Sequence, residues 1–231
     1  MIEQIKAEMK HIANPEKAVV LSRFFKTGKG EYGEGDLFLG ITVPEQRKIA
    51  RKYSLLPLNK LQKLLSSKIH EHRLTALLIL VIKYGKADED SREDIFNFYL
   101  SNMKHINNWD LVDLSADKIL GTHLLKRDRG ILFRMAKSRN IWERRIAIMT
   151  TFHFIKNNQF SETLAVAEIL LNDSHDLIHK AVGWMLREIG KRDRETEERF
   201  LLKYYSIMPR TMLRYAIEKF DDNKRKFYLR K

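Results

Sequence analysis

The sequence contains no cysteine and few residues that interrupt helices. It has no cysteine, four prolines and ten glycines among 231 residues. The absence of cysteine excludes disulfides, thiolate zinc sites and cysteine nucleophiles. No apolar run approaches the length of a membrane span, and the first residues, MIEQIKAEMK, have no continuous apolar core. We therefore expect a soluble, cytoplasmic protein.

Positive charge is in clear excess. The 43 lysines and arginines outnumber the 30 acidic residues by 13. An excess of this size suits a polyanionic partner, and nucleic acid is the commonest one in a cell. A generally lysine-rich composition is the simpler alternative. An acidic membrane surface is disfavoured, because no segment combines a basic helix face with a strongly apolar one.

Apolar residues recur at helical spacing almost throughout, and no alternating run predicts a strand. From about residue 58 the predicted helices repeat every 35 residues as helix pairs. Four columns of aligned positions are wholly apolar, whereas an apolar content of 44% would give about one or fewer by chance. On the first helices these columns are Leu61, Phe96, Ile131, Val166, Leu201 and Leu65, Leu100, Met135, Leu170, Tyr205. On the second helices they are Ala76, Leu111, Ile146, Ala181, Ala216 and Leu77, Val112, Ala147, Val182, Ile217.

Stacked helix pairs of this length form an α-solenoid whose second helices line one concave surface. The tryptophan, glycine and proline signature of tetratricopeptide repeats is absent, so HEAT-like repeats describe the pattern better. We predict an all-α, right-handed α-solenoid of HEAT-like helix pairs with a concave basic cleft. It would form a single domain over residues 1–231, with an N-terminal helical cap over 1–57 and five repeats over 58–231.

Two columns of aligned positions are mostly polar and predict the side chains on that concave surface. They are Thr75, Asp110, Arg145, Lys180, Tyr215 and Leu74, Trp109, Arg144, His179, Arg214. Cations gather in the third to fifth repeats, beside an aromatic residue in the second. A basic channel with an aromatic side chain suits a phosphodiester backbone. An ordinary solvated charged face is the alternative.

The segment NNWDLVDLSADKILG, residues 107–121, predicts a helix that is capped by Asn107 or Asn108 and ended by Gly121. Trp109 and Asp113 are four residues apart, so they share one face of that helix.

Asp113 stands in a column that is otherwise mostly apolar or small, with Leu78, Ile148 and Gly183 at the matching positions. A shielded carboxylate there would have a raised pKa unless a partner offsets the burial, and such acids cluster at functional sites. The alternative is an acid favoured by the dipole near a helix N-terminus, although Asp110 fits that role better. The residues alone leave both interpretations open.

Two further patterns are weaker. GKGEYG matches a dinucleotide glycine fingerprint through Gly28, Gly30 and Gly33, but it follows a helical segment rather than a strand. We therefore expect residues 27–40 to form a mobile loop that contacts phosphate at most. His175 and His179 are spaced to share a metal, but no third ligand is evident. We expect neither a metal nor a cofactor.

Four segments together resemble a known family. NNWDLVDLSADKILG, IWERRIAI, HKAVGWMLREIGK and FLGITVPEQR resemble the HEAT-like-repeat DNA alkylation repair glycosylases of the AlkD type. The resemblance spans nearly the whole chain. It implies a monofunctional hydrolase of base-excision repair. Such an enzyme excises cationic alkylated purines, such as 3-methyladenine and 7-methylguanine, from duplex DNA without a metal or nucleotide cofactor.

The resemblance also implies site residues. Asp113 matches the family's catalytic aspartate, Trp109 and Trp184 match its cleft tryptophans, and Arg145 matches its cleft arginine. The neighbouring cations Arg144, Lys180 and Arg187 are expected to bind DNA as well. The 35-residue register places Gly183, and not Trp184, in the column of Asp113, which turns Trp184 about 100° away on an ideal helix.

Three functions remain in competition. The first is the glycosylase, a monomer acting on alkylated duplex DNA and associated with the nucleoid when bound. The second is a non-catalytic HEAT-like module that binds nucleic acid through the same cleft. The third is a protein-interaction scaffold, the commonest role of α-solenoids, in which Asp113 has no special part.

Overall fold

The structure, a computed structural model, describes residues 1–230 and is all-helical. Within these residues the only extended pairing is an isolated bridge between Leu37 and Ile69. The prediction of an all-α chain is therefore confirmed. The chain divides into two compact units, unit 1 from Met1 to Ser115 and unit 2 from Ala116 onward.

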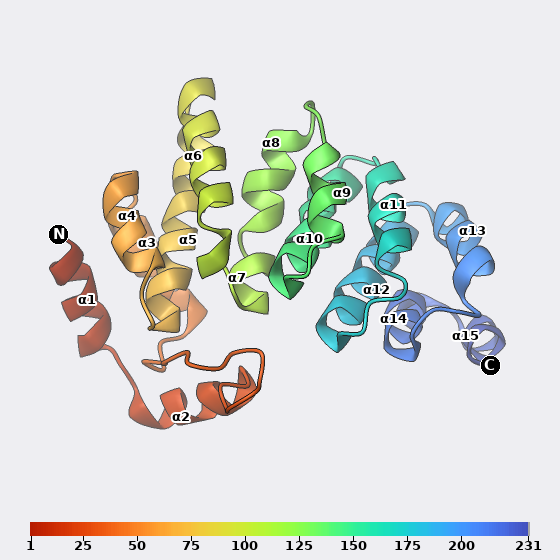
Figure 1. Ribbon diagram of the computed structural model, residues 1–231, viewed down its shortest axis with the longest axis horizontal. Helices are drawn as coiled ribbons and strands as arrows, with labels where there is room; N and C mark the ends of the chain where they lie inside the picture. Colours follow the sequence, from red (N-terminus) through yellow and green to blue (C-terminus); the bar gives the residue numbers. More distant parts are fainter. Residues whose placement is uncertain (231) are drawn as a thin grey trace. The chain divides into compact units, whose positions relative to one another are not determined.

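Unit 1 is built around one long helix, α5, which is buried over most of its length. Helices α3 and α4 pack along α5, and α6 and α7 also contact it (Figure 1). The elements of unit 1 are α1 (Ile2–His11), α2 (Pro15–Phe24), α3 (Val43–Lys52), α4 (Leu58–Leu65), α5 (His70–Lys86), α6 (Glu89–Ser101), η1 (Met103–His105) and α7 (Trp109–Asp113).

Unit 2 has two central helices, α10 and α12, which pack against each other. The π-helical segment η2 and α9 contact α10, and α13 and α14 contact α12. The elements of unit 2 are η2 (Asp117–Gly121), α8 (Thr122–Leu124), α9 (Gly130–Ala136), α10 (Ile141–Lys156), α11 (Ser161–Ile169), α12 (Asp176–Gly190), α13 (Arg194–Tyr204), α14 (Arg210–Ala216), η3 (Ile217–Lys219) and α15 (Asp222–Leu229).

Helix pairs recur along both units. The first helices are α4, α6, α9, α11 and α13, and the second helices are α5, α7, α10, α12 and α14. All ten positions of the two apolar second-helix columns are buried. The first-helix columns are less uniform, since Phe96, Leu100, Ile131 and Tyr205 are only half-buried. The division into a cap and five repeats, the right-handed twist and the concave basic cleft stay predictions.

The segment predicted as one helix over residues 107–121 is interrupted. It begins as expected, since the Asn108 side chain accepts a hydrogen bond from the backbone N–H of Trp109. Helix α7 ends at Asp113, however, because the Ser115 hydroxyl donates to the carbonyl of Leu111 at 2.5 Å. A serine hydroxyl that competes for a helix carbonyl favours such a break. Unit 1 ends at this point.

Gly121 was expected to end that helix, and this prediction is wrong. The chain continues through Gly121 from the π-helical segment η2 into α8. A Cβ atom at Gly121 would overlap the Thr150 carbonyl oxygen and the His153 side chain on α10. The glycine therefore serves close packing between η2 and α10 and does not cap a helix.

A buried carboxylate fastens the loop before α3 to the start of α5. Glu71 is 1% exposed, and its carboxylate accepts hydrogen bonds of 2.8 to 3.3 Å from the backbone N–H groups of Leu39, Gly40 and Ile41. Gly40 has a φ of +79°, and a Cβ atom there would overlap the Asn14 carbonyl oxygen. The loop can thus approach both α2 and α5 only with glycine at this position.

We expect Glu71→Gln to lower the free energy of unfolding by about 2 kcal/mol, because the amide loses the charge and half of the acceptor capacity that serve three buried donors. Urea denaturation followed by circular dichroism measures this. The matched control is Glu16→Gln on α2, an exposed acid that should change stability by less than about 0.5 kcal/mol. Equal effects of both substitutions would contradict the assignment.

Unit 2 contains a second buried carboxylate, Glu197 on α13. It is 1% exposed, it lies 3.3 Å from Arg194, and its Oε1 has no hydrogen-bond partner within the described part of the chain. Burial raises the pKa of Glu197 to about 8, against the opposing charge of Arg194. The folded state therefore holds the proton more tightly than the unfolded chain does. The resulting stability is complete below pH 4.5 and is lost as the pH rises through about 8.

Because glutamine resembles the protonated acid, Glu197→Gln should remove this pH dependence. Between about pH 5 and pH 9 the unchanged protein should lose at least about 1 kcal/mol of unfolding free energy relative to the variant. Urea denaturation at several pH values measures the difference. Glu195→Gln, an exposed acid on the same helix, should follow the unchanged protein. The same dependence of unfolding free energy on pH in all three proteins would contradict this prediction.

Candidate functional site

Helix α7 presents two side chains outward. Leu111 and Val112 are fully buried, whereas Trp109 and Asp113 are half-buried and lie one turn apart on the same face. The prediction that these two residues share a face therefore agrees with the geometry. Asp113 is the last residue of α7, at a helix end rather than in its middle.

An aromatic stack supports Trp109 from one side. The indole lies 5.1 Å from the Phe25 ring at 17°, and Phe25 lies 5.1 Å from Phe38 at 18°. Phe38 in turn stacks on the His70 ring at 4.7 Å. Phe24, which is 60% exposed, meets the indole edge-on at 5.8 Å. The covered face of Trp109 is thus fixed by packing.

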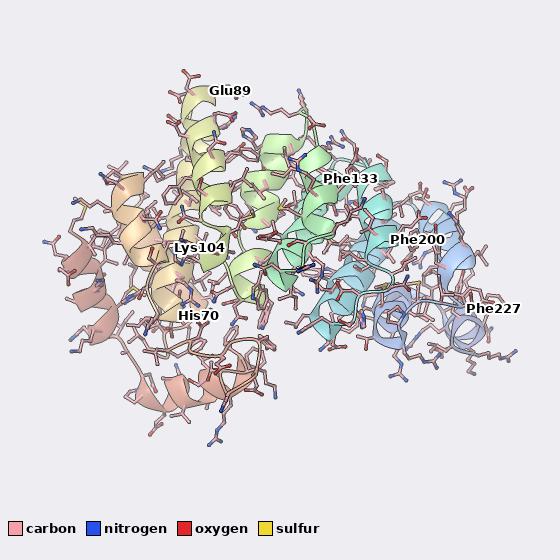
Figure 2. All side chains as sticks on the ribbon, in the orientation of Figure 1. His70, Glu89, Lys104, Phe133, Phe200 and Phe227 are labelled. Atoms are coloured by element: carbon pink, nitrogen blue, oxygen red, sulfur yellow. The ribbon has the colours of Figure 1, made fainter. Side chains whose placement is uncertain are left out.

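The stack ends at His70, which belongs to a buried network of charged side chains. His70 Nε2 is 2.8 Å from Asp110 Oδ2, and His70 Nδ1 is 3.2 Å from Asp36 Oδ2. Arg73 also donates to Asp36 at 2.6 Å. Figure 2 labels His70 at the end of α5 that faces the loop following α2. All four side chains are less than 9% exposed.

The protonation of His70 follows from its surroundings. Burial alone would lower its pKa, but the charge of Asp110 and the hydrogen bonds to Asp110 and Asp36 raise the pKa of His70 to about 8. His72, two residues along α5, has no such carboxylates, and burial lowers its pKa to about 4. One buried histidine of α5 is therefore charged at neutral pH and the other is neutral.

The sequence predicted that Asp110 lies in the first turn of α7 but did not indicate its ion-pair partner. Its side chain caps the Leu111 N–H and pairs with His70, which no motif singled out. The available signal was HEHR, four polar residues that open an otherwise apolar helix. Nothing in the sequence indicated that Phe25 and Phe38 form a stack with Trp109, because aromatic residues in a loop can pack against many different partners.

The two predicted arginines of α10 are engaged within unit 2. Arg144 is paired with Asp173 at 2.5 and 3.3 Å, and it also donates to two backbone carbonyls. Arg145 is 5% exposed and donates to the Leu177 carbonyl on α12. Both guanidinium groups thereby join neighbouring segments. Their roles in binding DNA stay predictions.

Among the predicted residues of α12, Lys180 is more exposed than Arg187, whose side chain is only 16% exposed. Lys180 pairs with Asp176 at 2.7 Å, and both side chains are at least 41% exposed. Trp184 donates to Glu188 at 3.2 Å, and Arg187 pairs with Glu218. Gly183 packs on α14, where a Cβ atom would overlap the Met212 carbonyl oxygen. This close contact explains why the register position of Asp113 is occupied here by glycine and not by Trp184.

The glycine-rich motif of residues 28–33 forms hydrogen bonds within its own loop. The Gly28 and Gly30 N–H groups donate to Glu31 and Glu34, and the Gly33 N–H donates to the Lys26 carbonyl. These amides are thus already satisfied without phosphate.

Residues 1–230 contain no group of three or more histidines and acids placed to hold a metal. His175 instead caps α12, and His179 bonds to the Asp173 carbonyl. None of the helices in the same residues has the length and apolar content needed to cross a membrane.

Comparisons with known proteins identify the class. The family model of DNA alkylation repair enzymes matches residues 5–220, so the chain belongs to that family. Its structure is similar to that of a predicted DNA alkylation repair enzyme from Enterococcus faecalis, with a TM-score of 0.70 and 17% sequence identity over 91% of this chain and 97% of that one. That similarity shows a shared fold. No curated protein matches the sequence.

The aromatic stack predicts unequal effects for two adjacent phenylalanines. Phe25→Leu should lower the free energy of unfolding by about 1–2 kcal/mol, because it leaves a cavity and removes the contacts of this ring with Trp109, Phe38 and His70. Phe24→Leu, at the exposed position, should change it by less than about 0.5 kcal/mol. Urea denaturation measures both, and a larger effect at Phe24 would contradict the assigned packing.

Proposed function

We propose that this protein is a monofunctional DNA glycosylase that hydrolyses the N-glycosidic bond of cationic N3- and N7-alkylated purines in duplex DNA. The class is supported by membership of the DNA alkylation repair enzyme family. The observation that carries the chemistry is the outward face of α7, which offers a carboxylate and an indole side by side. Asp113 is the catalytic residue of this proposal.

The proposed reaction needs little acid catalysis. A purine alkylated at N3 or N7 is positively charged, so it leaves as a neutral base when the bond to C1′ breaks. The sugar then becomes oxocarbenium-like, and a nearby carboxylate stabilises that charge. Asp113 supplies the negative charge and accepts a proton from the water whose oxygen bonds to C1′. The products are the free base and an abasic site.

Trp109 complements the carboxylate. An indole face attracts a cation within about 6 Å of the ring centroid, and the attraction strengthens where water is excluded. Phe25 covers one face of the indole, and this proposal places the cationic sugar or base against the other face. The stack holds the ring in place before substrate arrives, which reduces the entropy lost on binding.

Binding of the DNA backbone rests on the net charge of +13. Among the predicted DNA-binding residues, Lys180 is the most readily released. Its exposed pair with Asp176 contributes little free energy, so a phosphate can displace the aspartate at small cost. Arg145, Arg144, Trp184 and Arg187 remain proposed contacts of unit 2, and such phosphate contacts would make binding strongly salt-dependent.

The test is release of 7-methylguanine and 3-methyladenine from methylated duplex DNA under single-turnover conditions. We expect Asp113→Asn to reduce the rate constant at least about 100-fold, because the transition state loses its negative partner. Duplex binding should persist or tighten, since one negative charge is removed. The matched control is Asp90→Asn, an exposed acid at the start of α6, which should leave both quantities unchanged.

Two other results would change the conclusion. No release by the unchanged protein, together with salt-sensitive duplex binding, would support the non-catalytic nucleic-acid-binding module. Efficient release of neutral damaged bases would contradict the chemistry proposed for Asp113, which depends on a cationic leaving group.

A further inference from the structure

The side chain of His70 joins the two elements that hold Trp109. One is α7, reached through Asp110, the residue that directly follows Trp109. The other is the segment between α2 and α3, reached through Asp36 and carrying Phe25 and Phe38. Two hydrogen bonds of one imidazole ring thus connect the elements that hold the indole.

We propose that His70 is a positioning residue, whose imidazolium form clamps Asp36 and Asp110 together and thereby fixes Trp109 and Asp113 in the orientation used for base excision. The part concerning excision rests on the proposed function. The clamp itself is a property of unit 1 and is testable without DNA.

The clamp requires two protons on the ring. Each nitrogen of His70 faces a carboxylate oxygen, and only the doubly protonated ring donates to both. A neutral ring would turn a lone pair toward one of the carboxylates in a buried place, where repulsion is poorly screened. The ring would then lose its hydrogen bond either to α7 or to the segment with Phe25, and each of these elements supports Trp109.

The charged groups around His70 determine which contacts would be lost when the ring is deprotonated. Asp36 faces it from the segment after α2, Asp110 from α7, and Arg73 from α5 itself. Arg73 stays bonded to Asp36 in either state of the ring, so part of the network survives deprotonation. We therefore expect a local displacement of the aromatic stack and not global unfolding.

The first measurement is made on the free, full-length protein by NMR. The indole N–H resonance of Trp109, assigned with Trp109→Phe, is followed from about pH 6 to about pH 9.5 together with the ring resonances of His70. Both should move with one midpoint near 8, the pKa at which the clamp is lost. In His70→Gln the Trp109 resonance should no longer respond over this range.

The matched control is His72→Gln. His72 is also buried on α5 but is bonded to the Ser67 hydroxyl at 3.0 Å and carries no charge at neutral pH. The Trp109 titration should persist in this variant with an unchanged midpoint. The titration itself is followed on the unchanged protein, with Trp109→Phe used only to assign the resonance, so it decides the proposal even where His70→Gln folds poorly.

The second measurement is single-turnover base excision. The unchanged protein and His72→Gln should lose rate at least about tenfold between pH 7 and pH 9.5 with the same midpoint. His70→Gln should be slow at every pH, while its dissociation constant for duplex DNA stays within threefold. This separation of rate from binding distinguishes a positioning role from general loss of structure.

The outcomes separate the two proposals. A Trp109 resonance that ignores the titration of His70 overturns the clamp, and so does a His70→Gln variant with normal excision rate and pH profile. Should the unchanged protein excise nothing while Trp109 still follows His70, the glycosylase proposal fails and the clamp stands.

Discussion

Four consecutive buried polar side chains at the start of α5 determine how unit 1 is assembled. His70 bonds to α7 and to the segment after α2, and Glu71 holds the backbone of Leu39 to Ile41. His72 bonds to Ser67, and Arg73 bonds to Asp36 and to the Ser67 carbonyl. Together they connect the first turn of α5 to α7, to the segment between α2 and α3, and to Ser67 just before α5.

This arrangement contributes more to a single defined conformation than to the free energy of unfolding. Burying charge is costly, and a buried pair contributes little beyond what apolar packing would give. Removing one partner is far more costly than the pair is stabilising, because the other charge is left unpaired. The network therefore penalises alternative placements of α7 and of the loop, which suits the role proposed for Trp109 and Asp113 on that helix.

Much of this architecture was predictable from the sequence, and the reasons are local. Helical periodicity predicted the helix pairs, the pair Asn107 and Asn108 predicted the start of α7, and a spacing of four placed Trp109 beside Asp113. The break at Ser115 was missed because a hydroxyl that competes for a carbonyl leaves no trace in apolar periodicity. His70 was missed for another reason: its partners lie 34 residues before it and 40 residues after it. Polar residues do not reveal such distant partners, whereas apolar ones at least reveal that they are buried.

Helix α2 differs from the other long helices in having no buried side chain, and its Val19, Val20 and Phe24 are all more than half exposed. It is secured near its two ends, by the Asn14 contacts with Leu39 and by the ring contacts of Phe24 and Phe25. Opening such a helix exposes little additional apolar surface, mainly that of the half-buried Ala18 and Leu21. Its local free energy of opening is therefore nearly independent of the core beneath it, and its amide hydrogens should exchange with solvent far sooner than those of α5.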